Sequence, residues 1–187
     1  MQQPRSFDKT VGRPLRAKLP APLAEVAVFT LKHLWACLFG GLLLLAVICT
    51  NAIWADDWPI ARYDALFAFA VLTQAAMLLF KLETWQEAKV IGLFHLTGTA
   101  MEIFKVNAGS WAYPEDAFFI VVNVPLFSGF MYASVGSYIA RVVRIFDMRF
   151  TSYPPFWIPV VLAVAIYLNF FSHHYLPDIR LALFVAT

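Results

Sequence analysis

The sequence predicts an all-α protein, a polytopic bundle of transmembrane helices. Of its 187 residues, 61% are hydrophobic and 14% are charged, whereas soluble domains are about half apolar and about a quarter charged. The mean hydropathy is +0.69. A soluble fold built from this chain would have too little polar surface. We therefore expect one membrane domain over residues 22–187, with five complete spans and a partial sixth.

The first 21 residues differ from the rest. They contain five Lys or Arg residues and three prolines but no apolar run. We expect residues 1–21 to be a disordered basic tail that is retained, because a signal peptide would need a short apolar core and a cleavage site of small residues. From Pro22 to Leu34 the apolar residues follow a helical spacing. This predicts an amphipathic segment in the membrane plane that leads into the first span.

The remaining chain divides into apolar runs of membrane length. We place the spans at about 34–54, 63–80, 89–108, 117–140 and 156–175, with a sixth beginning at Arg180. The first has about 20 residues without a charge, which is the length that a bilayer requires.

Two features qualify the later spans. The fourth contains Asn123 and Pro125, which predict a kink. The final run, Arg180–Thr187, is too short to cross a bilayer. We therefore expect the sequence to be truncated at its C-terminus.

The distribution of Lys and Arg predicts the orientation. With the N-terminus inside, the tail and the inner loops hold eleven of these residues and the outer segments hold three. Cytoplasmic segments are enriched in Lys and Arg. The N-terminus is therefore expected in the cytoplasm. Because these charges lie at membrane edges rather than in a patch with stacking aromatic residues, we expect no nucleic-acid partner.

The third span carries ionisable residues on one face. On a period of about 3.6 residues, His95, Thr99, Glu102 and Lys105 share that face. A carboxylate or an ammonium in the centre of a bilayer costs about 2.5–3.5 kcal/mol on insertion scales. This face therefore needs neighbouring helices to shield it.

The predicted orientation brings polar residues of three spans to the outer half of the membrane. We expect Glu102 to act as general acid or base, with His173 or His174 as proton partner and Asp178 orienting the imidazole. Further residues are expected to contact a substrate; they are Arg62, Asp64, Lys105, Asn107, Trp111, Tyr113 and Asn169.

Several of these residues have structural alternatives. Glu102 and Lys105 can form a buried ion pair, and Trp111 and Tyr113 can be interface anchors. Further along the chain, Arg141, Arg144 and Arg149 are expected to anchor the inner interface. The small residues Gly129, Ala133 and Ser137 predict close helix contact and a face for a helix–helix oligomer.

No metal site is assigned. His174 and Asp178 are four residues apart, but Pro177 interrupts a helix between them, and a zinc site needs three or four convergent ligands. The motifs identify no cofactor.

Several separate blocks resemble the YoaT-like family of uncharacterised bacterial integral membrane proteins, defined by domain of unknown function 817. The match covers about residues 30–185 and includes Arg62-Tyr-Asp-Ala-Leu-Phe67, Lys81-Leu-Glu83, Phe94-His-Leu-Thr-Gly-Thr99, Met101-Glu-Ile-Phe-Lys105, Gly109-Ser-Trp-Ala-Tyr-Pro-Glu115, Val124-Pro-Leu-Phe-Ser-Gly129 and Asp178-Ile-Arg180.

The resemblance implies the bacterial inner membrane but no established activity. Members continue through further spans, including a second Glu followed by a Gly-x-Trp-x-Tyr-Pro turn. The layout of a helix Glu before a Trp/Tyr-Pro turn is also similar to that of membrane carotenoid cyclases and hydratases, in which carboxylates protonate an isoprenoid.

Three functions remain open from the sequence. The first is a membrane-embedded enzyme that acts on a lipophilic small molecule, a lipid or an isoprenoid, by acid/base chemistry. The second is a small-solute or ion transporter or channel, with the face of His95 and Glu102 lining a polar path. The third is a structural subunit of a membrane complex that docks through Gly129, Ala133 and Ser137. In each case the lipid bilayer is a partner.

Overall fold

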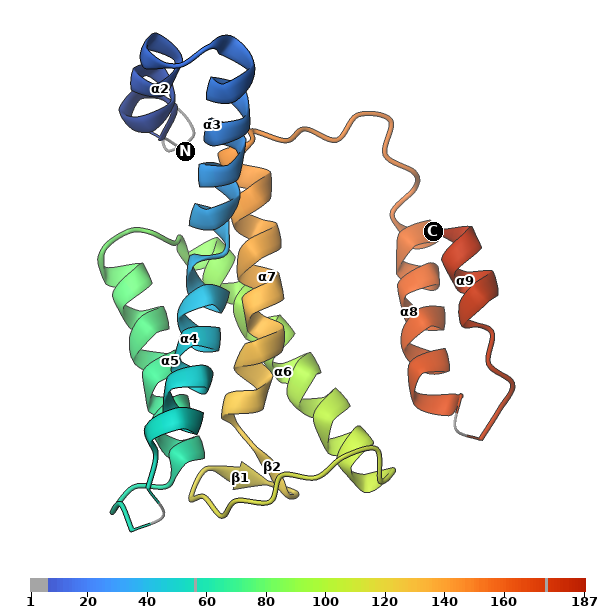
Figure 1. Cartoon of the computed structure of the whole chain (residues 1–187). Coiled ribbons are helices and arrows are strands. Elements are labelled where there is room, and N and C mark those ends of the chain that lie inside the picture. Colours follow the sequence, from blue (N-terminus) through green and yellow to red (C-terminus); the bar gives the residue numbers. More distant parts are fainter. Residues whose placement is uncertain (1–6, 56, 174) are drawn as a thin grey trace. The chain divides into compact units, whose positions relative to one another are not determined.

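The computed structural model describes residues 7–55, 57–173 and 175–187. Most of these residues are helical, and a two-stranded antiparallel sheet interrupts the helices (Figure 1). The chain forms two compact units, Met1–Met148 and Arg149–Thr187.

The N-terminal segment is helical where it is described. A π-helical turn, η1 (Asp8–Gly12), continues into α2 (Arg13–Lys18). Arg16 forms an ion pair of 2.7 Å with Asp8 within this segment and one of 2.7 Å with Glu25 of the next helix. The disordered tail expected over residues 1–21 is therefore wrong from Phe7 onward, and residues 1–6 lie outside the described part.

The first long apolar segment is bent. Helix α3 (Ala21–Ala36) and helix α4 (Leu38–Ile53) meet at Cys37 with an angle of 65° between them. The change of direction that the sequence predicts near residue 34 therefore falls at Cys37. Helix α5 (Arg62–Leu79) then agrees closely with the predicted span at 63–80.

The segments that are long and apolar enough to cross a membrane are found among these helices. Among the described residues, α5 is long and apolar enough to cross a bilayer, and the bent pair α3–α4 passes the same test if it is taken as one broken span. This is one or two of the five spans expected from the sequence. The protein is mostly helical, and five complete spans are not shown.

Helix α6 (Trp85–Asn107) begins with a capping box. The Thr84 hydroxyl accepts the backbone N–H of Glu87 at 3.3 Å, and the Glu87 carboxylate accepts the backbone N–H of Thr84 at 2.7 Å. These bonds satisfy two N–H groups that the start of a helix leaves without partners. The helix therefore starts four residues before the predicted boundary at residue 89.

The predicted fourth span at 117–140 is wrong at both ends. Residues 117–126 are not helical, and the helix that follows continues to Ile145. Strand β1 (Ile120–Val121) pairs with β2 (Val124–Pro125), and helix α7 (Phe127–Ile145) follows. The two residues between the strands have φ angles of 48° and 62°, which is typical of a tight hairpin turn.

Two features explain why this segment is extended rather than helical. Pro125 lacks the N–H that a helix interior requires. The Asp64 carboxylate of α5 accepts the backbone N–H groups of Phe118 at 2.8 Å and Phe119 at 2.9 Å. The backbone is therefore held open by a residue more than fifty positions earlier.

Helices α6 and α7 pack closely through glycines. A Cβ at Gly98 of α6 would lie 2.4 Å from the ring of Tyr132 of α7, and a Cβ at Gly136 of α7 would lie 2.8 Å from the ring of Phe94 of α6. A Cβ at Gly129 would meet Thr99 and His95. Small residues at such positions allow two helix backbones to approach.

This packing occupies the face that we expected to join two copies. Gly129, Ala133 and Ser137 are all buried. Ala133 lies in an apolar cluster with Phe39 of α4 and Ile91 of α6. The stripe of small residues therefore contacts other helices of its own chain.

The second unit contains two helices, α8 (Trp157–Ser172) and α9 (Arg180–Ala186). Their bounds fall within the predicted fifth span at 156–175 and at the predicted start of a sixth. Helix α8 is apolar, but its 16 residues are fewer than the about 20 that a transmembrane helix needs.

We predict that Gly98→Ala lowers stability by about 1–3 kcal/mol, because the added methyl group would overlap the Tyr132 ring. Thermal unfolding of the detergent-purified chain, followed by circular dichroism, measures this. Gly92→Ala on the same helix is the matched control, since a Cβ there meets nothing within 4 Å. It should leave the melting temperature unchanged or higher. Equal effects of the two substitutions would contradict the packing described.

Candidate functional site

Glu102 is a buried carboxylate with both oxygens engaged. Its side chain lies in the last turns of α6, and the residue is 3% exposed. Oε2 accepts hydrogen bonds from Trp111 Nε1 at 2.9 Å and Tyr113 Oη at 2.6 Å. Oε1 accepts one from Tyr132 Oη at 2.6 Å. Three neutral donors thus replace the water that burial removes.

Three segments bring these donors together. Gly109, with φ +71°, turns the chain back after α6, so that Trp111 and Tyr113 reach a carboxylate nine and eleven positions earlier. Tyr132 comes from α7, where its ring rests against Gly98. The Glu102 cluster, which we define as Glu102, Trp111, Tyr113 and Tyr132, therefore joins α6, the following loop and α7.

Tyr113 is a permanent hydrogen-bond donor to Glu102. Burial raises the pKa of its phenol above the ordinary value of 10, and the hydrogen bond to the Glu102 carboxylate raises it further. The hydroxyl group therefore stays protonated at all physiological pH values and continues to donate to Glu102. Its ring also packs edge-to-face on Tyr63, with centroids 5.9 Å apart.

Two residues that were predicted to contact a substrate, Arg62 and Asp64, instead bind the segment between α6 and α7. The guanidinium of Arg62 binds the Glu115 carboxylate in a bidentate manner, with Nε at 3.0 and 2.9 Å from the two oxygens. Asp64 accepts the backbone N–H groups of Phe118 and Phe119, as described above. Both residues therefore fix the segment that carries Trp111 and Tyr113.

The other predicted residues of the first unit lie on α6. Asn107 is exposed, and its side chain donates to the backbone carbonyl of Ile103 at 2.8 Å. Lys105 is buried on the same helix as Glu102. The structure therefore brings Glu102, Trp111 and Tyr113 into direct contact, and it places Arg62, Asp64 and Asn107 in supporting bonds.

The remaining predicted site residues belong to the second unit. His173 Nδ1 lies 2.8 Å from the backbone carbonyl of Phe170, and the buried Asn169 side chain reaches the carbonyl of Pro177 at 3.5 Å. His174 lies outside the described residues. A meeting of these groups with Glu102 stays a prediction.

The role expected of Asp178 stays a prediction, because His174 lies outside the described residues. The Asp178 carboxylate is bound by Arg180, with Nε at 2.8 Å and Nη2 at 2.5 Å from Oδ2. These bonds lower the pKa of Asp178 to about 2. Among the described contacts, Asp178 therefore binds the residue that begins α9.

A second buried charge cluster was missed by the sequence reasoning. Glu83 and Arg141 are 3% and 0% exposed, and Arg141 Nη2 lies 3.2 Å from Glu83 Oε1. Glu83 also accepts hydrogen bonds from Ser137 Oγ at 2.7 Å and Gln74 Nε2 at 2.5 Å. Arg141 Nη1 donates to the carbonyl of Trp35 at 3.1 Å.

Arg141, predicted as an anchor at the inner interface, instead has a fully buried side chain. Arg144, predicted in the same role, lies 3.0 Å from the Glu87 carboxylate and donates to the carbonyl of Leu82 at 2.9 Å. The sequence contained one usable signal, because Arg141 follows Ser137 by four residues and so continues the buried stripe of small residues on α7.

Among the described residues, no group of three or more His, Cys, Asp or Glu side chains is arranged to hold a metal ion.

The fold and the two clusters define a helical protein that buries carboxylates between its helices. Residues 25–187 match the family described as "Protein of unknown function (DUF817)", and the chain belongs to this family. It is similar to the uncharacterized protein YoaT of Bacillus subtilis (strain 168), with 44% identity over 158 residues, which are 84% of this chain and 59% of the relative. The chain thus spans about three-fifths of that relative's length. No solved structure matches it.

We predict that Arg141→Leu destabilises the protein by about 3–5 kcal/mol, because it leaves the Glu83 carboxylate buried without its cation. Chemical denaturation in detergent measures the loss. The double variant Glu83→Met with Arg141→Leu is the control, and it should regain most of the stability since both charges are gone. A double variant as unstable as the single one would contradict a buried ion pair.

The Asp178–Arg180 pair predicts a pH effect in the second unit. Because the folded pKa of Asp178 is about 2 and its ordinary value is 3.8, its stabilising contribution is present above pH 3.8 and is lost as the pH falls toward 2. Arg180→Gln should raise the pKa of Asp178 from about 2 toward 3.8, and the backbone N–H of residue 180, which still donates to the carboxylate, should keep it below 3.8. Carboxyl ¹³C NMR titration measures both values, and an unchanged pKa in the variant would contradict the pairing.

Proposed function

We propose that this chain is a multi-pass protein of the bacterial inner membrane, with its N-terminus in the cytoplasm, and that the Glu102 cluster performs acid/base chemistry on a lipophilic substrate. The supporting observation is the Glu102 carboxylate itself, 3% exposed and held by three neutral donors. Intramembrane ionisable residues are functional candidates by default.

Membrane placement is supported by which side chains face outward. Leu44 of α4, Leu72 of α5 and Leu93 and Leu96 of α6 are between 61% and 68% exposed. Several ionisable residues of α6, of α7 and of the turn before α6 are buried by contrast; they include Glu83, Glu102, Lys105 and Arg141. Apolar outer faces around a polar interior suit a lipid environment, whereas they would aggregate in water.

The geometry of the Glu102 cluster suits proton transfer. A carboxyl group can give a proton to a substrate atom or remove one, and the same hydrogen bonds from Tyr113 and Tyr132 stabilise the resulting carboxylate. Trp111 is 44% exposed while its indole N–H binds Glu102. Its ring therefore lies between the carboxylate and the surroundings, where an apolar substrate would approach.

Glu102→Gln tests the proposal. It keeps the size and most hydrogen bonds of the side chain but removes the acid, so a change in membrane lipids caused by overexpressing the protein should disappear. Lipid extracts compared by mass spectrometry measure this. Asp116→Asn, an exposed carboxylate of the same loop, is the matched control and should retain the change. A lipid profile that is the same with the Gln variant and the parent protein would contradict the enzymatic proposal.

A transporter is the second candidate, and the pair of charge clusters favours it. Buried polar groups occur at both ends of the α6–α7 pair, Glu83 with Arg141 at one and Glu102 at the other, with His95 between them in sequence. Between the two clusters, however, the rings of Phe94 and Tyr132 fill the glycine sites. Solute or proton flux into proteoliposomes that is lost with Glu102→Gln, without any change in lipid composition, would favour transport over catalysis.

A further inference from the structure

A charged cavity lies between the N-terminal helices, α3 and the end of α7. Its volume is about 520 Å³, and three cations line it: Lys9, Arg13 and Lys32. Two carboxylates, Asp8 and Asp147, also line it. Asp8 is already ion-paired with Arg16 at 2.7 Å, so the cavity has an excess of positive charge.

The position of Lys32 is fixed by a ring. Its ammonium lies 5.0 Å from the centroid of Phe146 at the end of α7, within the distance of a cation–π contact. Helix α3 therefore presents this charge to the cavity, while the exposed Lys9 approaches from η1.

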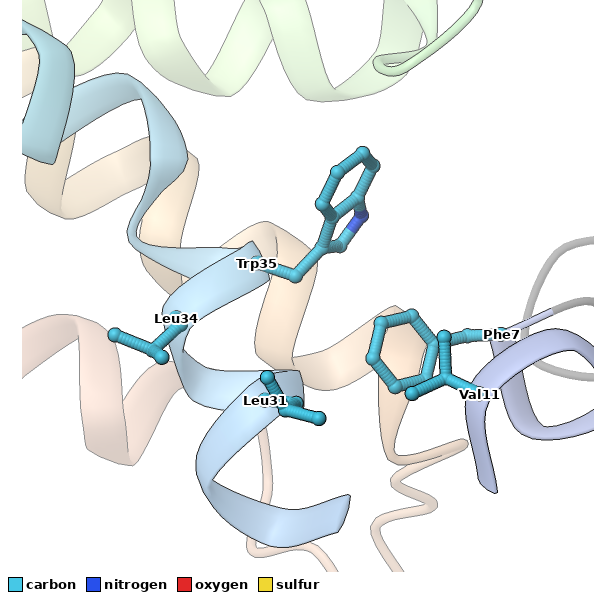
Figure 2. Close-up of a pocket in the computed structure, with 5 residues that line it drawn as sticks. All are labelled: Phe7, Val11, Leu31, Leu34 and Trp35. Atoms are coloured by element: carbon cyan, nitrogen blue, oxygen red, sulfur yellow. The ribbon is translucent and has the colours of Figure 1, made fainter. Parts of the chain in front are cut away.

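An apolar pocket adjoins the same helices. Figure 2 shows Phe7 and Val11 of the N-terminal segment opposite Leu31 and Trp35 of α3. The pocket has a volume of about 320 Å³, and Leu34 completes its lining. Both spaces are lined by residues of the N-terminal segment, within 7–13, and by residues of α3, within 31–35.

We propose that these two spaces bind one anionic glycerophospholipid, with the phosphodiester at Lys9, Arg13 and Lys32 and an acyl chain against Leu31, Trp35 and Phe7. Basic pockets beside membrane helices on the cytoplasmic side bind anionic headgroups. The cations lie in segments that the distribution of Lys and Arg assigns to that side. A free phosphate would use the cations but not the apolar pocket. The inference rests on the membrane placement proposed above and is independent of the chemistry at Glu102.

Native mass spectrometry of the full chain in an uncharged detergent tests the proposal. Phosphatidylglycerol and phosphatidylcholine with identical acyl chains are titrated separately. Phosphatidylglycerol should bind more tightly, and Lys9→Gln should weaken it about fivefold, with a similar factor for Lys32→Gln, as expected for one cation near a membrane surface. Lys32→Arg keeps the charge and should bind as the parent protein does.

Lys18→Gln is the matched control, because Lys18 is an exposed cation on the same N-terminal segment that lines neither space. It should leave the affinity unchanged. The proposal is overturned if phosphatidylcholine binds as tightly as phosphatidylglycerol, if Lys18→Gln weakens binding as much as Lys9→Gln, or if Lys9→Gln has no effect. Displacement of the lipid by equimolar inorganic phosphate would also overturn it, since the site would then recognise only the anion. Lys9 is exposed, so its substitution tests the site without disturbing the core.

Discussion

The buried pair of Arg141 and Glu83 is the contact on which the first unit depends. Removing two ions from water costs several kcal/mol for each, and this cost is offset only where the remaining donors and acceptors are satisfied. The Arg141 guanidinium reaches Glu83 in the α5–α6 turn, the Trp35 carbonyl of α3 and the Met77 sulfur of α5. One side chain of α7 therefore contacts three other segments.

The two charge clusters lower the mean hydropathy of the helices that contribute to them. Mean hydropathy averages over every face of a helix. In this fold Glu102 of α6 meets Tyr132 of α7, whereas Leu93 and Leu96 of α6 and Val135 and Ile139 of α7 are exposed. Helix α5 has few ionisable residues, and so its average remains apolar. The polarity of α6 and α7 thus reflects what they bury rather than what surrounds them.

Most helices could be predicted because their signals are local. The bounds of α5 and α8 follow from apolar runs, and the contact of Glu102 with Trp111 and Tyr113 joins residues that are close in sequence. The extended segment before α7 could not be predicted in this way, since Asp64 holds it from 54 residues away. Pro125 does interrupt the helix, but the sequence around a proline looks the same whether it kinks a helix or precedes the start of one.

The same limit applied to the charges. The positive-inside rule counts Arg141 as an interface residue without knowing that Glu83 lies opposite it, because only the folded chain brings the two together across 58 positions. The N-terminal residues show the reverse case. A basic, proline-containing segment has the composition of a disordered tail, yet it is helical in the structure and Arg16 pairs with Glu25 of α3.

The exchange of rings and glycines between α6 and α7 has a mechanical consequence. Tyr132 of α7 fits over Gly98 of α6, while Phe94 and His95 of α6 fit over Gly136 and Gly129 of α7. Sliding either helix by one turn would drive each ring into a neighbouring side chain, so this pair has no low-energy path for axial translation. A conformational change within the first unit would therefore keep this pair together and use a segment outside it, such as the bend at Cys37.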